Sequence, residues 1–230
     1  MFMGSPGDTT TPYMPTPRTT PTRARERVSY DRELVHSVLD AGYLCHLGFV
    51  RDGAPVVLPT LYARVGERLY VHGSTGSRPL RDAGRPEVRA DGGMPVCVTV
   101  THVDGLVLAK SAFHHSVNYR SVVVHGRAVQ VTGHEERLLA LDALVDNVVP
   151  GRAADSRPAD ARELAATAVL RVELAEVSVK VRTGGPKDEP EDLGLPHWSG
   201  VLPVAPVYGT PVPADDLAPG IPVPGYLTAR

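Results

Sequence analysis

Hydrophobic and polar residues alternate along much of the chain, and a period of two is typical of β-strands with one buried face. The clearest case is the segment in which Leu170, Val172 and Leu174 are separated by Arg171 and Glu173. The same pattern predicts strands at residues 43–50, 55–65, 68–72, 96–103, 106–113, 121–131 and 169–181. The chain is therefore expected to be mainly β.

Short turns that contain glycine join several of these strands. Asp52-Gly53, Gly66-Glu67 and Asp104-Gly105 are typical of tight β-hairpins. The last pair predicts that residues 96–103 and 106–113 form a hairpin of their own. Seven strands joined mostly in this way exclude a doubly wound parallel sheet, because parallel strands need long crossover connections. They favour an antiparallel barrel with helices added at its ends.

Helical periodicity interrupts the strands at four places. Leu34, Val35, Val38 and Leu39 recur at helical spacing behind Asp31, whose side chain is suited to capping the first turn. The other helices are predicted to start near Pro79 and to cover residues 134–148 and 159–166.

The 22 prolines divide the chain into three parts. Residues 1–22 hold five prolines and seven threonines and have little to bury, which predicts a disordered tail. Residues 184–230 hold ten prolines interleaved with apolar residues, which predicts an extended arm packed on the domain or on a partner subunit. Trp198, the only tryptophan, would anchor this arm or cover a binding site. Residues 23–183 form the predicted folded domain.

Composition and charge exclude several classes of protein. The formal net charge is −2, whereas a nucleic-acid-binding protein normally has a basic excess. Two cysteines are too few for a disulfide framework. The sequence contains no apolar run long enough to cross a bilayer and no signal-peptide pattern at its start. We therefore expect a cytoplasmic protein that binds neither nucleic acid nor membrane.

The segment at residues 70–80 has the composition of a phosphate-binding loop. A predicted strand ends at His72, a turn rich in glycine, serine and threonine follows, and Pro79 is suited to the first turn of a helix. Helix starts attract anions, and Ser74, Ser77 and Arg78 add hydrogen-bond donors. An ordinary strand-to-helix turn capped by Ser77 would have the same composition.

The connection at residues 111–121 concentrates hydrogen-bonding side chains, including His114 and His115. Adjacent residues of an extended segment point to opposite sides, so these histidines cannot both bind one metal ion. A zinc site would need further ligands at suitable spacing, and none is present. Haem needs only a single axial histidine, so a haem ligand at either position stays open.

Nucleophilic catalysis is not supported by the sequence. The Gly-x-Ser-x-Gly pattern of a hydrolase elbow is absent, and Ser74 lies between glycines at a different spacing. Cys45 and Cys97 lie within apolar predicted strands, which favours packing residues over nucleophiles.

Four strings in this order carry a resemblance to a known family. They are YLCHLGFV (43–50), PVVLPTLYA (55–63), LYVHGSTGSR (69–78) and SAFHHSVNYRSVVVHGRAVQV (111–131). The sequence resembles the pyridoxamine 5′-phosphate oxidase-like family of split-barrel flavoproteins, and within it the flavin-nucleotide-binding branch that includes nitroimidazole-resistance proteins. The resemblance implies a six- to seven-stranded antiparallel split β-barrel of the FMN-binding type. It also implies a homodimer with FMN at the subunit interface.

The resemblance also suggests roles for individual residues. Ser77 and Arg78 match the family's phosphate-binding motif, although Pro79 replaces its lysine. His72 matches a histidine that lies near the flavin in nitroimidazole-resistance proteins and is the candidate catalytic residue. Two further segments are implied to contact the flavin: Leu58, Pro59 and Thr60 along its ring, and Tyr119, Arg120 and Ser121 from the partner subunit.

The function expected from this resemblance is an FMN-dependent oxidoreductase acting on a small molecule, with His72 as a proton donor. The C-terminal signature of a true pyridoxamine phosphate oxidase is absent. Three alternatives stay open: a flavin carrier or sensor without turnover, a haem protein with His72, His114 or His115 as axial ligand, and a protein that uses a deazaflavin.

Overall fold

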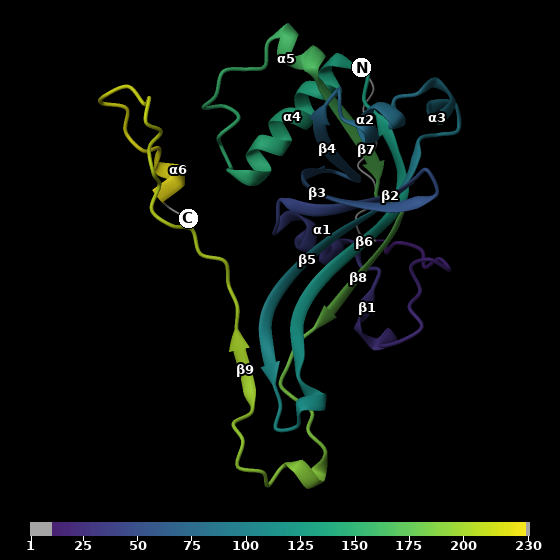
Figure 1. The fold of residues 1–230 in the computed structure, drawn as a ribbon, viewed down its shortest axis with the longest axis vertical. Helices are drawn as coiled ribbons and strands as arrows, with labels where there is room; N and C mark the ends of the chain where they lie inside the picture. Colours follow the sequence, from purple (N-terminus) through teal and green to yellow (C-terminus); the bar gives the residue numbers. More distant parts are fainter. Residues whose placement is uncertain (1–10, 229–230) are drawn as a thin grey trace.

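A closed antiparallel barrel of six strands forms the centre of the protein, which a computed structural model describes over residues 11–228 (Figure 1). The strands follow one another around the ring in the order β6–β7–β4–β3–β2–β5, and β5 pairs with β6 to close it. Their bounds are β2 (Leu44–Arg51), β3 (Ala54–Val65), β4 (Arg68–Ser74), β5 (Met94–Leu108), β6 (Ser116–Gln130) and β7 (Thr167–Glu173). The structure confirms the predicted mainly β, antiparallel barrel.

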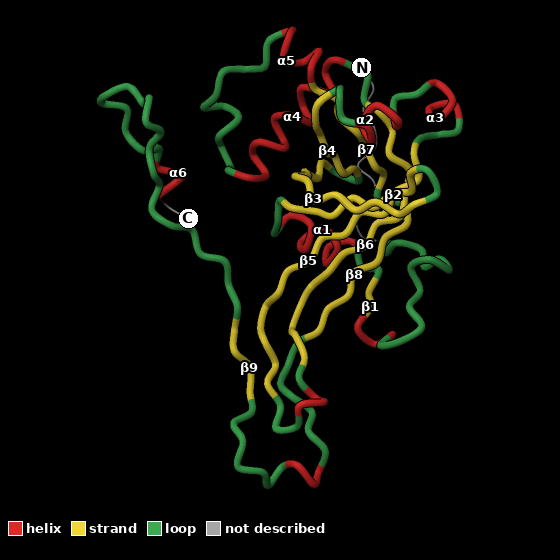
Figure 2. Tube along the Cα trace, viewed as in Figure 1, coloured by secondary structure: helices red, strands yellow, loops and turns green. Residues whose placement is uncertain are grey.

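The two longest strands, β5 and β6, continue past the barrel as a long hairpin (Figure 2). Three shorter strands extend the sheet there: β8 (Glu176–Arg182) pairs with β6, β1 (Val28–Ser29) with β8, and β9 (Gly200–Pro203) with β5. The described residues therefore form nine strands, against the seven predicted.

The helices cover the ends of the barrel. Asp31 caps the first one as predicted, because its carboxylate accepts the Leu34 backbone N–H at 2.8 Å. Asn147 ties another to the sheet by donating to the carbonyls of Gly42 and Tyr62. The helices are α1 (Arg32–Asp40), α2 (Arg78–Ala83), α3 (Pro86–Ala90), α4 (His134–Val148), α5 (Ala161–Ala166) and α6 (Gly225–Thr228), with 3-10 turns at Arg25–Arg27, Ala112–His114 and Pro190–Asp192.

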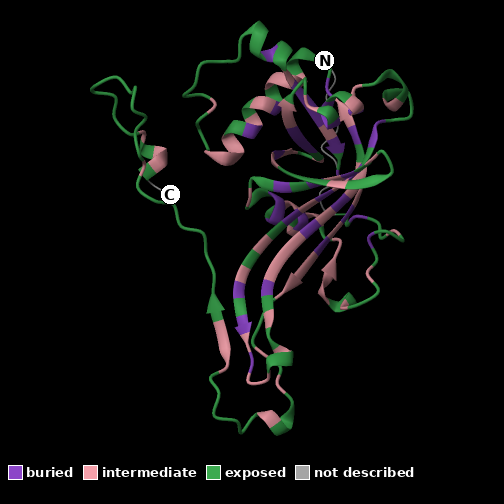
Figure 3. Cartoon of the chain, in the orientation of Figure 1, coloured by how far each residue is buried: buried purple, intermediate pink, exposed green. Residues whose placement is uncertain are grey.

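Buried residues concentrate inside the barrel and under α1, as Figure 3 shows. Leu39 and Val38 of α1 are fully buried against strand residues such as Val98 and Val122. Cys45 is buried in the same cluster, as expected for a packing residue. The barrel interior is thus a filled core, and any binding site must lie on its outside.

The predicted hairpin at Asp104-Gly105 is wrong. Both residues lie within β5, where the pairing with β6 shifts between Val103 and Gly105. Arg120 of β6 binds the Asp104 carboxylate with two hydrogen bonds, so the aspartate is held across the sheet instead of in a turn. A side chain at Gly105 would lie 2.9 Å from Val201, so the glycine permits β9 to approach.

The predicted strand at residues 169–181 is divided in two by a bend after Glu173. Its first half, β7, pairs with β4 in the barrel, and its second half, β8, pairs with β6 in the extension. Alternation continues through the bend, because both halves bury one face. Periodicity alone therefore could not reveal the break.

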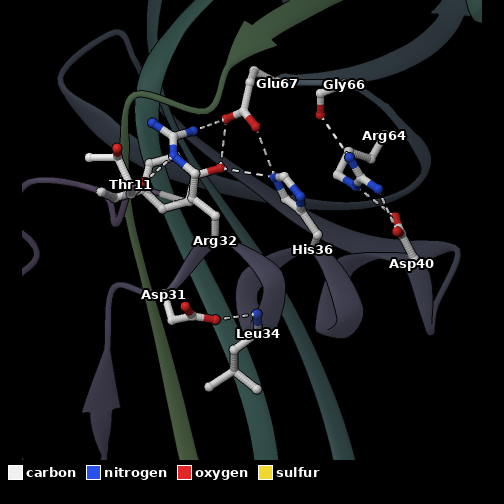
Figure 4. Close-up of polar contacts among 10 residues, drawn as sticks. Thr11, Asp31, Arg32, Leu34, His36, Asp40, Arg64, Gly66 and Glu67 are labelled. Carbon is white, nitrogen blue, oxygen red and sulfur yellow. Dashed lines mark hydrogen bonds and ion pairs between the residues drawn. The ribbon is translucent and has the colours of Figure 1, made fainter. Parts of the chain in front are cut away.

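The predicted disorder of residues 1–22 is wrong for residues 11–22, which pack on the barrel, while residues 1–10 lie outside the described part. Tyr13 is only 3% exposed, and its hydroxyl donates to Glu67 at 2.8 Å. His36 lies 3.1 Å from the same hydroxyl, and the Arg32 guanidinium stacks on the tyrosine ring at 4.1 Å. Figure 4 shows this cluster, in which Arg32 also reaches the Thr11 carbonyl. Tyr13 thus anchors the start of the segment, and Arg18, which pairs with Glu176, anchors a later part of it.

Within the C-terminal arm, β9 pairs with β5, and the residues after it run apart from the barrel to α6 (Figure 1). Trp198 lies against Gly200, where a Cβ would meet the indole ring at 2.9 Å, and it is 67% exposed. Tyr226 of α6 donates to Asp155 at 2.5 Å and accepts from Arg152 at 3.1 Å. Packing of the arm on a partner subunit stays a prediction. No helix among residues 11–228 is long and apolar enough to span a membrane.

Candidate functional site

A large cavity of about 1210 Å³ lies outside the barrel, between α4, the loop at residues 149–160 and the ends of β3, β4 and β7. Most of its wall is apolar, and charged side chains stand where the loop borders it. Arg152 and Arg157 are the cationic residues of this border. The apolar lining comes from Leu61, Leu138, Leu141, Leu144, Val145, Val148 and Val149.

His72 near the end of β4 also lines this cavity. Its Nδ1 is buried and has no hydrogen-bond partner among the described residues. Burial lowers the pKa of His72, so the imidazole is neutral at pH 7. Buried polar atoms are normally satisfied, so an imidazole that lines an apolar cavity and leaves Nδ1 without a partner is suited to bind a ligand. This places the predicted catalytic residue at the apolar cavity beside α4.

Local hydrogen bonds hold the cavity loop in place. The Asp146 carboxylate accepts the Ala153 backbone N–H at 2.8 Å, which fixes the start of the loop to α4. Arg157 pairs with Glu163 at 2.6 Å, and this glutamate belongs to the capping box of α5. Arg152 is held by Tyr226 from the C-terminal helix. The two border arginines are thus held by the following helix α5 and by the C-terminal helix α6.

A second cavity, of about 500 Å³, lies beside α2 and is lined by five arginines. Ion pairs occupy three of them: Arg51 with Asp52, Arg85 with Asp82 and Arg127 with Asp91. The side chains of the other two, Arg78 and Arg81, have no partner within the described part of the chain. The predicted phosphate ligand Arg78 therefore borders a basic pocket.

The predicted phosphate loop is only partly arranged as expected. The helix α2 starts at Arg78, one residue before Pro79, and Ser77 precedes it without a side-chain capping bond. Ser74 accepts the Gly76 backbone N–H at 3.1 Å, which stabilises the turn. Ser74 and Ser77 line neither of the two cavities.

The other predicted flavin contacts lie on two separate strands. Leu58, Pro59 and Thr60 are in the outer half of β3, where Leu58 is 37% exposed, and the next residue, Leu61, lines the large cavity. The second group, Tyr119, Arg120 and Ser121, lies on β6, which β5 and β2 separate from β3. Three strand spacings of about 4.8 Å amount to roughly 14 Å, so one chain does not bring the groups together.

Arg120 has a structural role within its own chain. Its guanidinium donates to Asp104 at 2.8 and 2.9 Å, and this bidentate contact lowers the pKa of the Asp104 carboxyl. The arginine would have to leave this partner, or share it, in order to bind a flavin.

His114 and His115 lie on the connection between β5 and β6 and line neither cavity. His115 Nδ1 is 3.0 Å from the Ser111 carbonyl, and His114 is 3.6 Å from Glu189. Among the described residues, no group of three or more side chains could hold a metal ion. Burial raises the pKa of Cys45 to about 12 and also raises that of Cys97, which excludes a reactive thiolate at neutral pH.

Comparison with known proteins settles the family. Residues 31–181, about two thirds of the chain, match the family described as pyridoxamine 5′-phosphate oxidase. The chain belongs to this family. A search of the curated proteins gave no significant match.

Solved structures of this split-barrel family include two that are similar over nearly their whole length. The flavocytochrome Anf3 from Azotobacter vinelandii is 37% identical, with a TM-score of 0.84, covering 95% of this chain and 98% of its own. An FAD and haem binding protein from Mycobacterium smegmatis is 38% identical, with a TM-score of 0.81, covering 88% and 96%. A putative 5-nitroimidazole antibiotic resistance protein from Bacteroides thetaiotaomicron shares the fold at 20% identity and a TM-score of 0.53, covering 67% and 86%.

Sequence reasoning missed the charged residues that border both cavities. Arg152 and Arg157 lie in an irregular loop that has no motif. Arg51 and Arg127 come from two different strands, and Arg85 comes from the turn between α2 and α3. The composition of the chain could have suggested that arginines line its binding sites, because 21 of the 24 basic residues are arginine. Arginine is the residue suited to planar, bidentate recognition of carboxylates and phosphates.

Proposed function

We propose that this chain is a redox protein that binds both a flavin and haem, with haem in the cavity beside His72. The single observation that carries the haem assignment is the position of the His72 imidazole, which lines an apolar cavity while its Nδ1 has no hydrogen-bond partner among the described residues. The flavocytochrome and the FAD and haem binding protein support it, because both are more than 35% identical to this chain over most of its length.

The residues present fit haem in three respects. The cavity volume of about 1210 Å³ is ample for a macrocycle, since pockets for ligands of drug size measure about 300–1000 Å³. His72 is neutral because burial lowers its pKa, and neutral imidazole is the form that binds iron. Arg152 and Arg157 stand at the border of the apolar site, where haem propionates would share them with their partners Asp155 and Glu163.

For the flavin, we propose that Arg78 binds its phosphate and that the exposed part of β3 at Leu58, Pro59 and Thr60 lies along its ring. Arg78 is suited to this role because its guanidinium faces a basic pocket and has no partner within residues 11–228. Bound together, the two cofactors would supply hydride and single-electron transfer. The chain's own residues position them, exclude water from the apolar cavity and keep His72 neutral.

We further propose that the active form is a homodimer. Several large apolar residues on neighbouring strands of the sheet are exposed in the single chain, which is unusual unless a partner covers them. They include Leu44, Val57, Val103 and Leu106, which lie on the same side of the sheet. A partner seated on this face would bring its own Tyr119–Ser121 segment toward β3, as the family resemblance implies. Within one chain, the Tyr119–Ser121 segment and the Leu58–Thr60 segment lie on strands that are not neighbours.

The substrate of this protein is proposed only by class, as a small molecule that exchanges electrons with the flavin. FMN, as expected from the sequence, and FAD share the phosphate that Arg78 would bind. Turnover distinguishes an enzyme from a carrier. It is measured as the steady-state oxidation of a reduced nicotinamide or dye by the protein with its cofactors bound.

The proposal is tested by titrating the cofactor-free protein with haem and following the Soret band. The wild type is expected to bind one haem per chain, and His72→Leu is expected to lose the spectrum of a histidine-ligated haem. His114→Leu and His115→Leu are matched controls that remove the other two candidate ligands and should bind as the wild type does. Normal haem ligation in His72→Leu, or its loss in either control, would refute the assignment.

A further inference from the structure

The short helix α6 at the end of the C-terminal arm contacts the loop that borders the large cavity (Figure 1). Between Pro203 of β9 and Gly225 of α6, the described chain forms no helix or strand. The hydroxyl of Tyr226 accepts a hydrogen bond from Arg152 at 3.1 Å and donates one to Asp155 at 2.5 Å. These two contacts, called the C-terminal latch below, tie the end of the arm to the cavity loop.

The backbone of the loop is shaped to receive the tyrosine ring. Gly151 has a φ of 86°, and a Cβ at this position would lie 4.0 Å from the Tyr226 ring. The Arg152 N–H donates to the Val149 carbonyl at 3.0 Å, and the Ser156 hydroxyl donates to the Arg152 carbonyl at 2.8 Å. The ring of Tyr226 therefore lies against an ordered turn, while its hydroxyl bridges two charged side chains of that turn.

The tyrosine hydroxyl competes with Arg152 for one carboxylate oxygen. Asp155 Oδ2 lies 3.4 Å from the Arg152 guanidinium but only 2.5 Å from the Tyr226 hydroxyl. Because the shorter contact is made with the tyrosine, the aspartate is kept from closing fully on the arginine. Arg152 lines the cavity, so its charge stays available to an acidic group of a ligand bound there. Without the hydroxyl, the two side chains are free to form a direct ion pair.

From this geometry we propose that Tyr226 is a positioning residue of the large cavity. It latches α6 onto the loop and keeps Arg152 directed toward the carboxylates of a bound apolar ligand. The inference rests on the proposed haem binding for the identity of this ligand, but not for the latch itself. Contacts between partly exposed polar groups open more easily than a packed core. The end of the arm thereby controls how long the cavity retains its ligand.

The latch is tested without a ligand by hydrogen–deuterium exchange of the full cofactor-free chain. Tyr226→Phe keeps the ring and removes only the hydroxyl. We expect the amides of residues 151–157 to exchange about two- to ten-fold faster in this variant, as for the loss of an ordinary hydrogen bond. Tyr43→Phe is the matched control, because this exposed tyrosine lies outside the cavity lining and its hydroxyl has no partner among the described residues. Equal exchange of the loop in Tyr226→Phe and the wild type overturns the latch.

The effect on the ligand is measured on the haem-loaded chain. Tyr226→Phe is expected to transfer haem to apomyoglobin about two- to ten-fold faster than the wild type or Tyr43→Phe. Its haem reduction potential is expected to fall, because a nearby positive charge disfavours the oxidised iron and Arg152 would now be neutralised by Asp155. Arg152→Gln should show both changes, and adding Tyr226→Phe to it should lower the potential no further. A merely structural role would leave the potential unchanged, so an unchanged potential overturns the positioning role.

The latch and the proposed function can fail independently. A chain that binds no haem, but whose loop exchanges faster in Tyr226→Phe, keeps the latch and loses both the haem and the role of Arg152 toward it. A chain that binds haem, but in which Tyr226→Phe changes neither the exchange of the loop nor the loss of haem, keeps the proposed function and loses the latch.

Discussion

Replacing His72 by leucine should make the cofactor-free protein more stable, although it removes the proposed haem ligand. The Nδ1 atom of His72 is buried without a partner, and an unsatisfied buried polar group costs about 1–3 kcal/mol. Because the His72 side chain is only half-buried, we take the lower end of this energy range. Leucine has a similar size and no polar atom, so we expect the free energy of unfolding to rise by about 1 kcal/mol.

Thermal and urea denaturation followed by circular dichroism measure this change. For a chain of this length, 1 kcal/mol corresponds to a rise in Tm of roughly 2–4 °C. His115→Leu is the matched control, because its Nδ1 already contacts the Ser111 carbonyl and its side chain is exposed. We expect this control to unfold at nearly the wild-type temperature or slightly below it.

The pH dependence of stability gives a second readout of the same residue. Burial lowers the pKa of folded His72, so below about pH 6.5 the unfolded chain takes up a proton that the folded chain refuses. The wild type should therefore lose stability as the pH falls from about 6.5 toward the folded pKa. His72→Leu should lose less stability over this range. The part due to His36, whose pKa is also lowered by burial, should remain in both proteins.

A specific result would refute this reasoning. If His72→Leu were less stable than the wild type by 1 kcal/mol or more, with an unchanged pH dependence, His72 would be satisfied in the folded chain. The imidazole would then not be held ready for a ligand.

Three further substitutions test other parts of the structure. Arg78→Ala should weaken flavin binding about ten-fold or more in a fluorescence titration, since a hydrogen bond to a charged group contributes about 1.5–3 kcal/mol; an unchanged Kd removes Arg78 from the site. Tyr13→Phe removes the hydroxyl that contacts Glu67 and should lower the unfolding free energy by about 1–2 kcal/mol in urea; no loss would mean that the contact contributes nothing. Tyr226→Phe removes the bond to Asp155 and should speed proteolysis of the C-terminal arm, whereas an unchanged rate would show that the arm is held elsewhere.

Features of the fold that depend on neighbouring residues could be predicted from the sequence. Asp52 and Gly53 both have positive φ, at 52° and 75°, so this pair forms the tight β2–β3 turn that it predicts. Asp31 likewise caps α1, because a capping bond reaches only three residues along the chain.

Features set by distant contacts were not predictable in the same way. Asp104-Gly105 has the sequence of a turn, but Arg120 and β9 hold it inside a strand, and both partners are remote in sequence. Tyr13 is ordered by residues up to 54 positions away. Local turn preference is weak compared with such contacts, so composition alone suggested a hairpin and a disordered tail.

The candidate site also contains some residues that the sequence could predict and others that it could not. The sequence resemblance singled out His72 and Arg78, and each of them borders a cavity. The cavities themselves arise only when helices and loops pack on the outside of the barrel. Their remaining charged residues could not be found before the fold was known.

The central claim is that one chain holds both a flavin and a histidine-ligated haem. The most direct test is the absorbance spectrum of the full-length protein as purified, followed by extraction and quantification of its cofactors. We predict a Soret band together with flavin absorbance, and near-equal amounts of haem and protein. A protein that lacks either band, and that does not take up the missing cofactor when it is supplied, would contradict the account.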